Sequence, residues 1–167
     1  SGKSIVYYYK VNLNSFPSGT PTLAESGGID GGPGVWTFQP SIGANTLGDV
    51  GLVYCQSSSS TFPTIRYTGR AAGAGSFEPP TTVKASPSFS NSDRWGDYAS
   101  VSSDPTDESL WVTHEWAKTT ASHDWGTWWA NLTFSTNPLL NFVSAALSGG
   151  NGNQTVDPNE CNDLRVA

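Results

Sequence analysis

Two stretches of the chain, 59 positions apart when Ser41 is aligned with Ser100, follow the same plan. The first reads PSIGANTLGDVGLVYC from Pro40, and the second reads YASVSSDPTDESLWVTH from Tyr98. Each contains a strand of small residues, a turn led by Asn or Asp, and an apolar strand that ends in a polar loop. A repeat of one strand-turn-strand unit restricts the chain to folds that stack or join such units.

The remainder of the chain also predicts strands and turns. The Gly- and Pro-rich segment Gly27–Gly34 is typical of a loop, and Pro138–Leu147 is the one segment with helical spacing. Alternating, β-branched or aromatic segments predict strands at Ile5–Leu13, Val35–Phe38, Ser41–Ala44, Val50–Cys55, Thr64–Gly69, Thr81–Ala85, Tyr98–Ser102, Leu110–Trp116 and Trp125–Phe134.

About four strands with short turns make up each unit, which is the internal plan of a propeller blade. The step between the units is a blade period of about 40 to 50 residues with a longer loop. We therefore expect an all-β fold, a partial β-propeller of about three four-stranded blades over residues 1–136. Evenly spaced strands also fit a β-sandwich or jelly roll, which is the alternative fold. Residues 137–167 are expected to be a linker and the start of a following module.

Composition excludes several classes of protein. The chain carries 8 Lys and Arg against 14 Asp and Glu, a net charge of −6, and no basic cluster. This charge disfavours binding to nucleic acid or to an anionic membrane surface. No apolar run approaches the roughly 20 residues of a membrane-spanning helix, so membrane insertion is not expected. Low charge, no Met and many Ser, Thr, Gly and aromatic residues indicate a secreted, processed β protein.

From Arg94 the sequence RWGDYASVSSDPTDESLWVTHEWA resembles large secreted bacterial surface proteins with sialidase-like β-propeller regions. Arg94-Trp95-Gly96-Asp97-Tyr98, the Asp104-Pro105 hairpin and the aromatic strand ending at Glu115 stand at the positions of that group's pattern. The resemblance covers about residues 35–134. The C-terminal GNGNQTVDPNE is similar to the loop that opens an immunoglobulin-like module in such proteins. The resemblance implies a piece of a larger exported protein, and it specifies no activity.

Carboxylates and arginines are the candidate ligand-binding groups. Glycosidases need facing carboxylates, or a Tyr nucleophile with an acid/base partner, and sialidase-like propellers add arginines that grip the substrate's carboxylate. Arg94, Asp97 and Trp128 are the candidate ligand-binding residues, with Arg66 and Arg70 as further arginines to test. The alternative is structural: Asp97 pairs with Arg94, and Asp104 caps its own turn. His114 and His123 have no partner at metal-ligand spacing.

Three further features bear on metals, disulfides and glycans. Oxygen-bearing residues Asn151, Asn153, Asp157 and Glu160 predict a weak calcium site, with Asp104, Asp107 and Glu108 as a second candidate. Cys55 and Cys161 either pair with each other, closing a long loop, or stay unpaired. Asn131 and Asn153 head glycosylation sequons. Exposed Trp side chains stack on sugar rings, but large aromatics equally pack between blades. Alternation places Trp128 and Trp129 on opposite faces.

The sequence thus predicts a non-enzymatic secreted or cell-surface β module for structural assembly or adhesion. Its expected partners are other copies, or other parts of the parent protein, met through open β edges, and also glycans. A sialidase-like glycoside hydrolase or glycan-binding propeller is the alternative. An accessory domain of a secreted peptidase is a third hypothesis.

Overall fold

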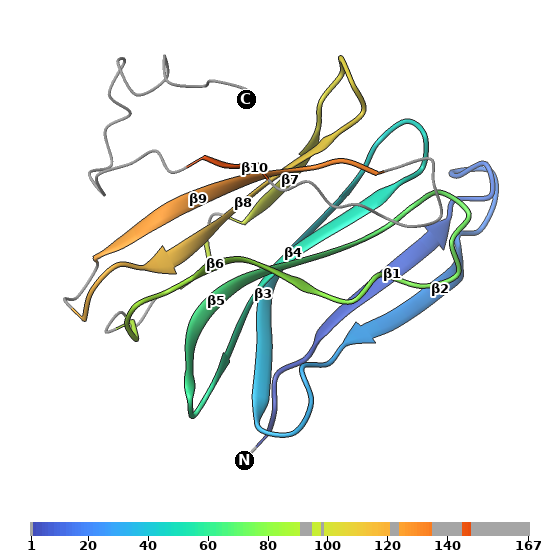
Figure 1. Ribbon diagram of the computed structural model, residues 1–167. Helices are drawn as coiled ribbons and strands as arrows, with labels where there is room; N and C mark the ends of the chain where they lie inside the picture. Colours follow the sequence, from blue (N-terminus) through green and yellow to red (C-terminus); the bar gives the residue numbers. More distant parts are fainter. Residues whose placement is uncertain (1, 91–94, 98, 121–123, 135–144, 148–167) are drawn as a thin grey trace.

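The computed structural model describes residues 2–90, 95–97, 99–120, 124–134 and 145–147. These residues form β-strands and no helix, which confirms the all-β prediction (Figure 1). The ten strands are β1 (Val6–Asn12), β2 (Thr22–Ile29), β3 (Val35–Ala44), β4 (Val50–Ser58), β5 (Thr61–Arg70), β6 (Thr81–Ala85), β7 (Ser100–Ser103), β8 (Leu110–Ala117), β9 (Trp125–Leu132) and β10 (Ala145–Leu147).

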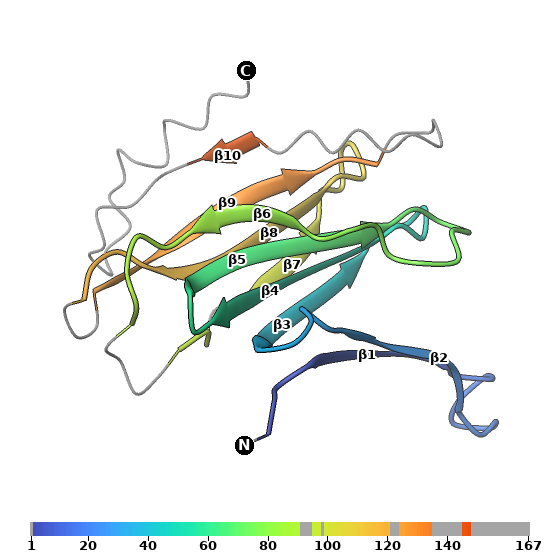
Figure 2. The same cartoon turned by 60° about the horizontal axis from the view of Figure 1, so that its bottom comes forward.

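The strands pair into three antiparallel sheets, each in chain order. β1 and β2 form a two-stranded hairpin, β3 to β6 form a four-stranded sheet, here called the middle sheet, and β7 to β10 form a second four-stranded sheet, the last sheet. In Figure 2 the hairpin lies below β3 of the middle sheet, and the strands of the last sheet overlap those of the middle sheet in this view. The described chain therefore contains two complete strand meanders and one two-stranded unit.

The central strands of the middle sheet, β4 and β5, are buried on both faces. Side chains alternate along each strand, so successive residues contact different neighbours. Val53 of β4 and Ile65 and Tyr67 of β5 face the last sheet, where they join a core completed by Leu110, Val112, Ala130 and Leu132. Leu52 and Tyr54 face the opposite way and pack with Val6 of the hairpin. The continuous apolar run of β4 follows from this double burial.

A row of three glycines crosses the middle sheet on the face that meets the last sheet. Gly43 of β3 pairs with Gly51 of β4, which pairs with Gly69 of β5. A Cβ atom on these residues would lie 2.9 Å from a Val101 methyl, 2.8 Å from a Leu110 methyl and 2.8 Å from the Phe134 ring, respectively. The missing side chains thus make room for apolar groups of the last sheet.

The turns of the two repeated stretches dock onto each other and differ in length by one residue. Asn45 N–H bonds to Asp49 O in the first turn, four positions along, and Asp104 N–H bonds to Ser109 O in the second, five positions along. Each turn is capped by its leading residue, because Asn45 Oδ1 accepts from the Asp49 N–H and Asp104 Oδ1 accepts from the Thr106 N–H, both at 2.9 Å. The two stretches therefore share a capped turn between paired strands, but the turns themselves are not the same.

Glu108 joins these two turns. Its carboxylate accepts hydrogen bonds from Thr46 N–H at 2.9 Å and from the Thr46 hydroxyl at 2.7 Å. Its carbonyl accepts a third bond from Asn45 Nδ2 at 2.7 Å. Glu108 holds a φ of 63°, a left-handed conformation that is rare outside glycine and Asn or Asp. The contacts across the two turns hold it there.

Two segments differ from the prediction because tertiary contacts override local preference. Gly27 and Gly28 belong to strand β2, not to a loop, and they lie opposite Tyr8 and Tyr7. A Cβ on Gly27 would lie 2.5 Å from the Tyr8 hydroxyl oxygen, so the glycine makes room for a cross-strand ring. β3 runs unbroken from Val35 to Ala44, with a register shift between Phe38 and Ser41 where two strands were predicted.

The C-terminal segment differs as well. Ala145–Leu147, within the segment predicted to be helical, pairs antiparallel with β9. This short strand is the fourth strand of the last sheet, although the sequence division places it in the linker after residue 136. A strand edge left open by β9 outweighs the helical spacing of so short a segment.

Candidate functional site

The two further arginines, Arg66 and Arg70, are held by the chain's own side chains and backbone. Arg66 Nη1 and Nη2 donate to Thr82 Oγ1 at 2.6 Å and to the Pro80 carbonyl at 2.7 Å. Arg70 forms an ion pair with Glu25 at 2.5 Å. Both arginines lie on the hairpin side of the middle sheet, since they alternate with Ile65 and Tyr67.

Asp97 lies on the opposite side of the middle sheet. It is exposed and follows Gly96, whose N–H donates to Glu115 of the last sheet at 2.7 Å. Arg94 lies outside the described residues. The described arginines therefore have partners of their own and form no cluster with Asp97.

A buried histidine and a buried carboxylate lie side by side on β8. Glu115 N–H donates to His114 Nδ1 at 2.7 Å, so the His114 proton is on Nε2, which donates to the Gln39 carbonyl at 2.9 Å. Burial raises the pKa of Glu115, which the Asp97 charge raises further and the Gly96 N–H lowers. Burial lowers the pKa of His114. Both groups hold the β3 bulge and the β6–β7 connection, and neither is open to substrate.

The candidate calcium residues Asn151, Asn153, Asp157 and Glu160 lie outside the described residues. In the second candidate group, Asp104 accepts hydrogen bonds from the Thr106 hydroxyl and N–H and from Trp111 Nε1, which lower its pKa. Asp107 caps the Ser109 N–H. Across the described residues no three His, Cys, Asp or Glu side chains gather as they would around a metal ion.

Cys55 lies between the middle and last sheets with no exposed surface. It is not in a disulfide with any described residue, and Cys161, its predicted partner, lies outside the described part. Burial raises the pKa of the Cys55 thiol to about 12. A thiol with this pKa stays protonated and unreactive at neutral pH.

Trp128 and Trp129 point to opposite faces of the last sheet, as alternation predicts. Trp129 is 46% exposed. Trp128 packs against the core between the sheets and meets Trp116 edge to face, with 6.1 Å between ring centroids. Lys84 Nζ of β6 lies 3.9 Å from the Trp128 ring and 4.4 Å from the Trp116 ring. Trp128 is thus in contact with the chain's own lysine.

The hairpin carries the largest group of exposed apolar side chains on one element. Tyr7, Tyr9 and Val11 of β1, with Leu13 beyond it, are between 51% and 66% exposed, and so is Leu23, which lies opposite Val11. We call these five residues the hairpin face. The alternation in the sequence YYYKVNL was the available signal for it. Amino-acid composition does not indicate which face of the β1–β2 hairpin is left uncovered.

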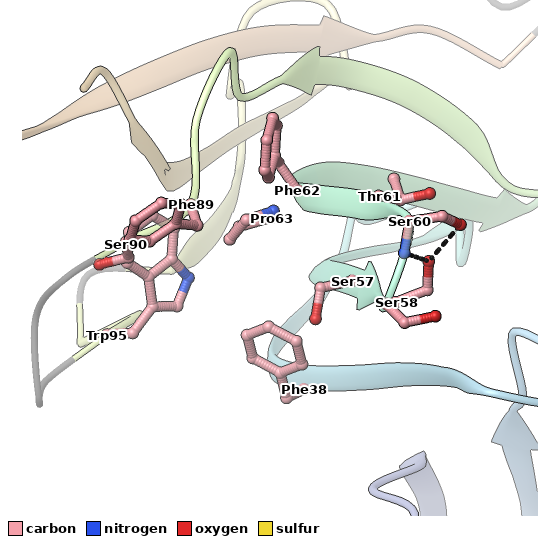
Figure 3. A pocket seen from close by; sticks show the side chains of 11 residues that line it. Phe38, Ser57, Ser58, Ser60, Thr61, Phe62, Pro63, Phe89, Ser90 and Trp95 are labelled. Carbon is pink, nitrogen blue, oxygen red and sulfur yellow. Dashed lines mark hydrogen bonds between the residues drawn. The ribbon is translucent and has the colours of Figure 1, made fainter. Parts of the chain in front are cut away.

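A second surface is an open groove of about 570 Å³ at the end of the middle sheet, here called the end groove (Figure 3). The aromatic side chains of Phe38, Phe62, Phe89 and Trp95 lie around it, and hydroxyl side chains from Ser57 to Thr61 line one side. Ser57 and Ser58 end β4, and Ser59 and Ser60 form the turn to β5. The groove forms where the β4–β5 turn meets the β6–β7 connection, which are distant in sequence.

Asn131, which heads one of the two sequons, lies in a strand and not in a surface loop. It lies in β9, and its side-chain amide donates to Ser109 Oγ at 2.7 Å.

Within the described ranges no helix has the length and apolar character needed to cross a membrane. No protein-family model, no curated protein and no solved structure matches the chain. The hairpin face and the end groove are therefore the features from which a function can be inferred.

Proposed function

We propose that this chain is a non-enzymatic β module of a secreted or cell-surface protein, and that it serves structural assembly or adhesion. The hairpin face carries this proposal, because four large apolar side chains are exposed on the two-stranded sheet, and Leu13, just beyond β1, is exposed as well. Contiguous exposed apolar surface of this kind marks interaction sites in soluble proteins.

The finer fold that we propose is a pair of adjacent propeller blades with part of a third. Its support is the strand order, since each four-stranded sheet is a simple meander in chain order. Propeller blades have this order, whereas sandwiches of the immunoglobulin type use connections that cross between sheets. The capped turns led by Asn45 and Asp104, which each join two paired strands, add to this support.

The occupant that we assign to the hairpin face is a second copy of the chain. The opposite face of the same hairpin already packs on the middle sheet through Val6, Tyr8 and Ile29. The hairpin face presents the same kind of surface outward and contains no charged residue, so two copies meet without like-charge repulsion. Both edges of the hairpin are also unpaired among the described strands, which offers backbone groups to a neighbour.

Sedimentation velocity over a range of protein concentrations tests this assignment. The chain is expected to shift from monomer to larger species as the concentration rises. The double variant Tyr7→Thr/Tyr9→Thr keeps strand-forming residues and is expected to remain monomeric. The matched control is Leu47→Thr, which replaces an exposed apolar side chain in the Asn45–Asp49 turn. A wild-type chain that stays monomeric, or a double variant that associates like the wild type, would overturn the proposal.

A further inference from the structure

As far as the structure describes its lining, the end groove combines aromatic and hydroxyl side chains and holds no charged one. Phe62 and Phe89 are 47% and 51% exposed, respectively, although large aromatic rings are usually covered. Beside them lie the hydroxyl groups of Ser57 to Thr61, and none of the lining residues in the described part of the chain is charged. The groove thus offers flat apolar ring faces next to neutral hydrogen-bonding groups.

The walls of the groove are fixed by hydrogen bonds from the two sheets. Ser86 N–H donates to the Pro63 carbonyl at 3.1 Å, which ties the β6–β7 connection to β5. Ala117 N–H of the last sheet donates to the Ser86 hydroxyl at 2.9 Å. Thr64 Oγ1 donates to the Phe62 carbonyl at 3.0 Å. The backbone next to Phe62 and the start of the segment that leads to Phe89 are therefore anchored, and a site on anchored backbone loses less entropy on binding.

The two strands that lead into and out of the serine-rich turn are closed to strand addition. β4 is paired with β3 and β5, and β5 is paired with β4 and β6, so both strands are internal to the middle sheet. β3, which contributes Phe38 to the lining, is an edge strand of that sheet. An occupant that lies over the serines and Phe62 is therefore recognised through their side chains, not by adding a strand to β4 or β5.

We propose that the end groove binds a neutral oligosaccharide of about two or three sugar rings. The C–H faces of a pyranose ring match exposed aromatic faces, and its hydroxyls match the Ser and Thr side chains along one side. The volume of about 570 Å³ lies within the range of small-molecule sites, roughly 300–1,000 Å³. The absence of charge from the described lining disfavours an acidic sugar, which needs arginine or lysine. This inference is independent of assembly through the hairpin face.

Nuclear magnetic resonance titration of the ¹⁵N-labelled full chain tests the proposal. The probes are cellotriose, xylotriose and chitotriose, with lactose and 3′-sialyllactose as a neutral and acidic pair. At least one neutral probe is expected to shift the amide signals of Ser57, Ser58, Ser60 and Thr61. Phe62→Ala and Phe89→Ala are each expected to weaken that binding about five- to tenfold, because each removes one ring face. Leu47→Ala, also an exposed apolar position, is expected to leave affinity unchanged.

Any one of the following results would overturn the proposal. It is wrong if no neutral probe shifts these signals at millimolar concentration, or if both Phe variants bind like the wild type. It is also wrong if 3′-sialyllactose binds more tightly than lactose, since that result requires a cationic site. Shifts confined to Tyr7 and Tyr9 place the sugar on the hairpin face and also refute the groove. Because both Phe side chains are exposed, the variants are expected to fold, and unchanged circular dichroism spectra check this.

Discussion

The glycine row of the middle sheet gives a quantitative test of how the two large sheets pack. In the Gly51→Ala variant, the new Cβ lies 2.8 Å from a Leu110 methyl carbon and 3.4 Å from a Leu132 methyl carbon. Leu110 is fully buried and cannot swing away into solvent. Overpacking of this kind costs about 1–3 kcal/mol. The loss of glycine's backbone freedom returns about 0.5–1 kcal/mol, so the expected net destabilisation is about 0–2.5 kcal/mol.

The assay is urea unfolding followed by tryptophan fluorescence, with linear extrapolation of the free energy of unfolding. Gly75→Ala is the matched control, because no heavy atom lies within 4 Å of its added Cβ, and it is expected to change stability by at most about 1 kcal/mol, in the stabilising direction. Leu110→Val removes the methyl that clashes. In that background Gly51→Ala is expected to become neutral or stabilising, with a coupling of about 1–2 kcal/mol.

Two results would contradict this expectation for Gly51→Ala. If Gly51→Ala costs no more than Gly75→Ala, the two sheets do not press together at this row. If the cost of Gly51→Ala is the same with Leu110 or Val at position 110, the clash lies elsewhere. Either result refutes the proposed packing of the last sheet on the middle sheet.

Three further predictions follow from the buried and bridging groups. Because the folded-state pKa of Glu115 is raised, stability contributed by its protonated form is present below the unfolded pKa and is lost as pH rises through the folded pKa. Glu115→Gln is therefore expected to flatten this fall in urea-unfolding free energies measured from pH 4 upward; an unchanged pH profile contradicts it. Cys55 is expected to resist iodoacetamide at pH 8 in the native chain and to react in urea, read by peptide mass spectrometry; native labelling at Cys55 would show that the thiol is accessible. Glu108→Ala removes the two hydrogen bonds to Thr46 and is expected to cost about 0.5–1.5 kcal/mol in urea unfolding. A Thr46→Ala change that adds fully to it would argue against direct coupling.

Much of the secondary structure follows from local signals in the sequence. The alternation from Leu110 to Trp116 and from Trp125 onward predicts β8 and β9. Trp128 and Trp129 lie on opposite faces of the last sheet, as this alternation predicts. Asn45 and Asp104 lead turns because their short side chains cap the backbone that follows. These features depend only on residues close together in the chain.

The sequence alone does not identify either candidate surface. The hairpin face depends on which side of β1 the middle sheet covers, and the end groove depends on the meeting of the β4–β5 turn with the β6–β7 connection. The candidate arginines illustrate the same limit, because Arg66 and Arg70 are bound by Thr82 and Glu25 on a face that composition cannot assign. Pattern and composition can nominate residue types without locating them in space.

Most strand positions, the capping of the Asn45 and Asp104 turns and the all-β class were therefore determined by the sequence itself, because alternation and capping act over a few residues; β2 and β10 were not. The contact between the two large sheets was decided only by the tertiary structure. Gly43, Gly51 and Gly69 are unremarkable in three separate segments, and they form one row only when β3, β4 and β5 pair in register. The side chains that fill the space above that row come from residues more than 50 positions further along the chain, where no local preference can specify the match.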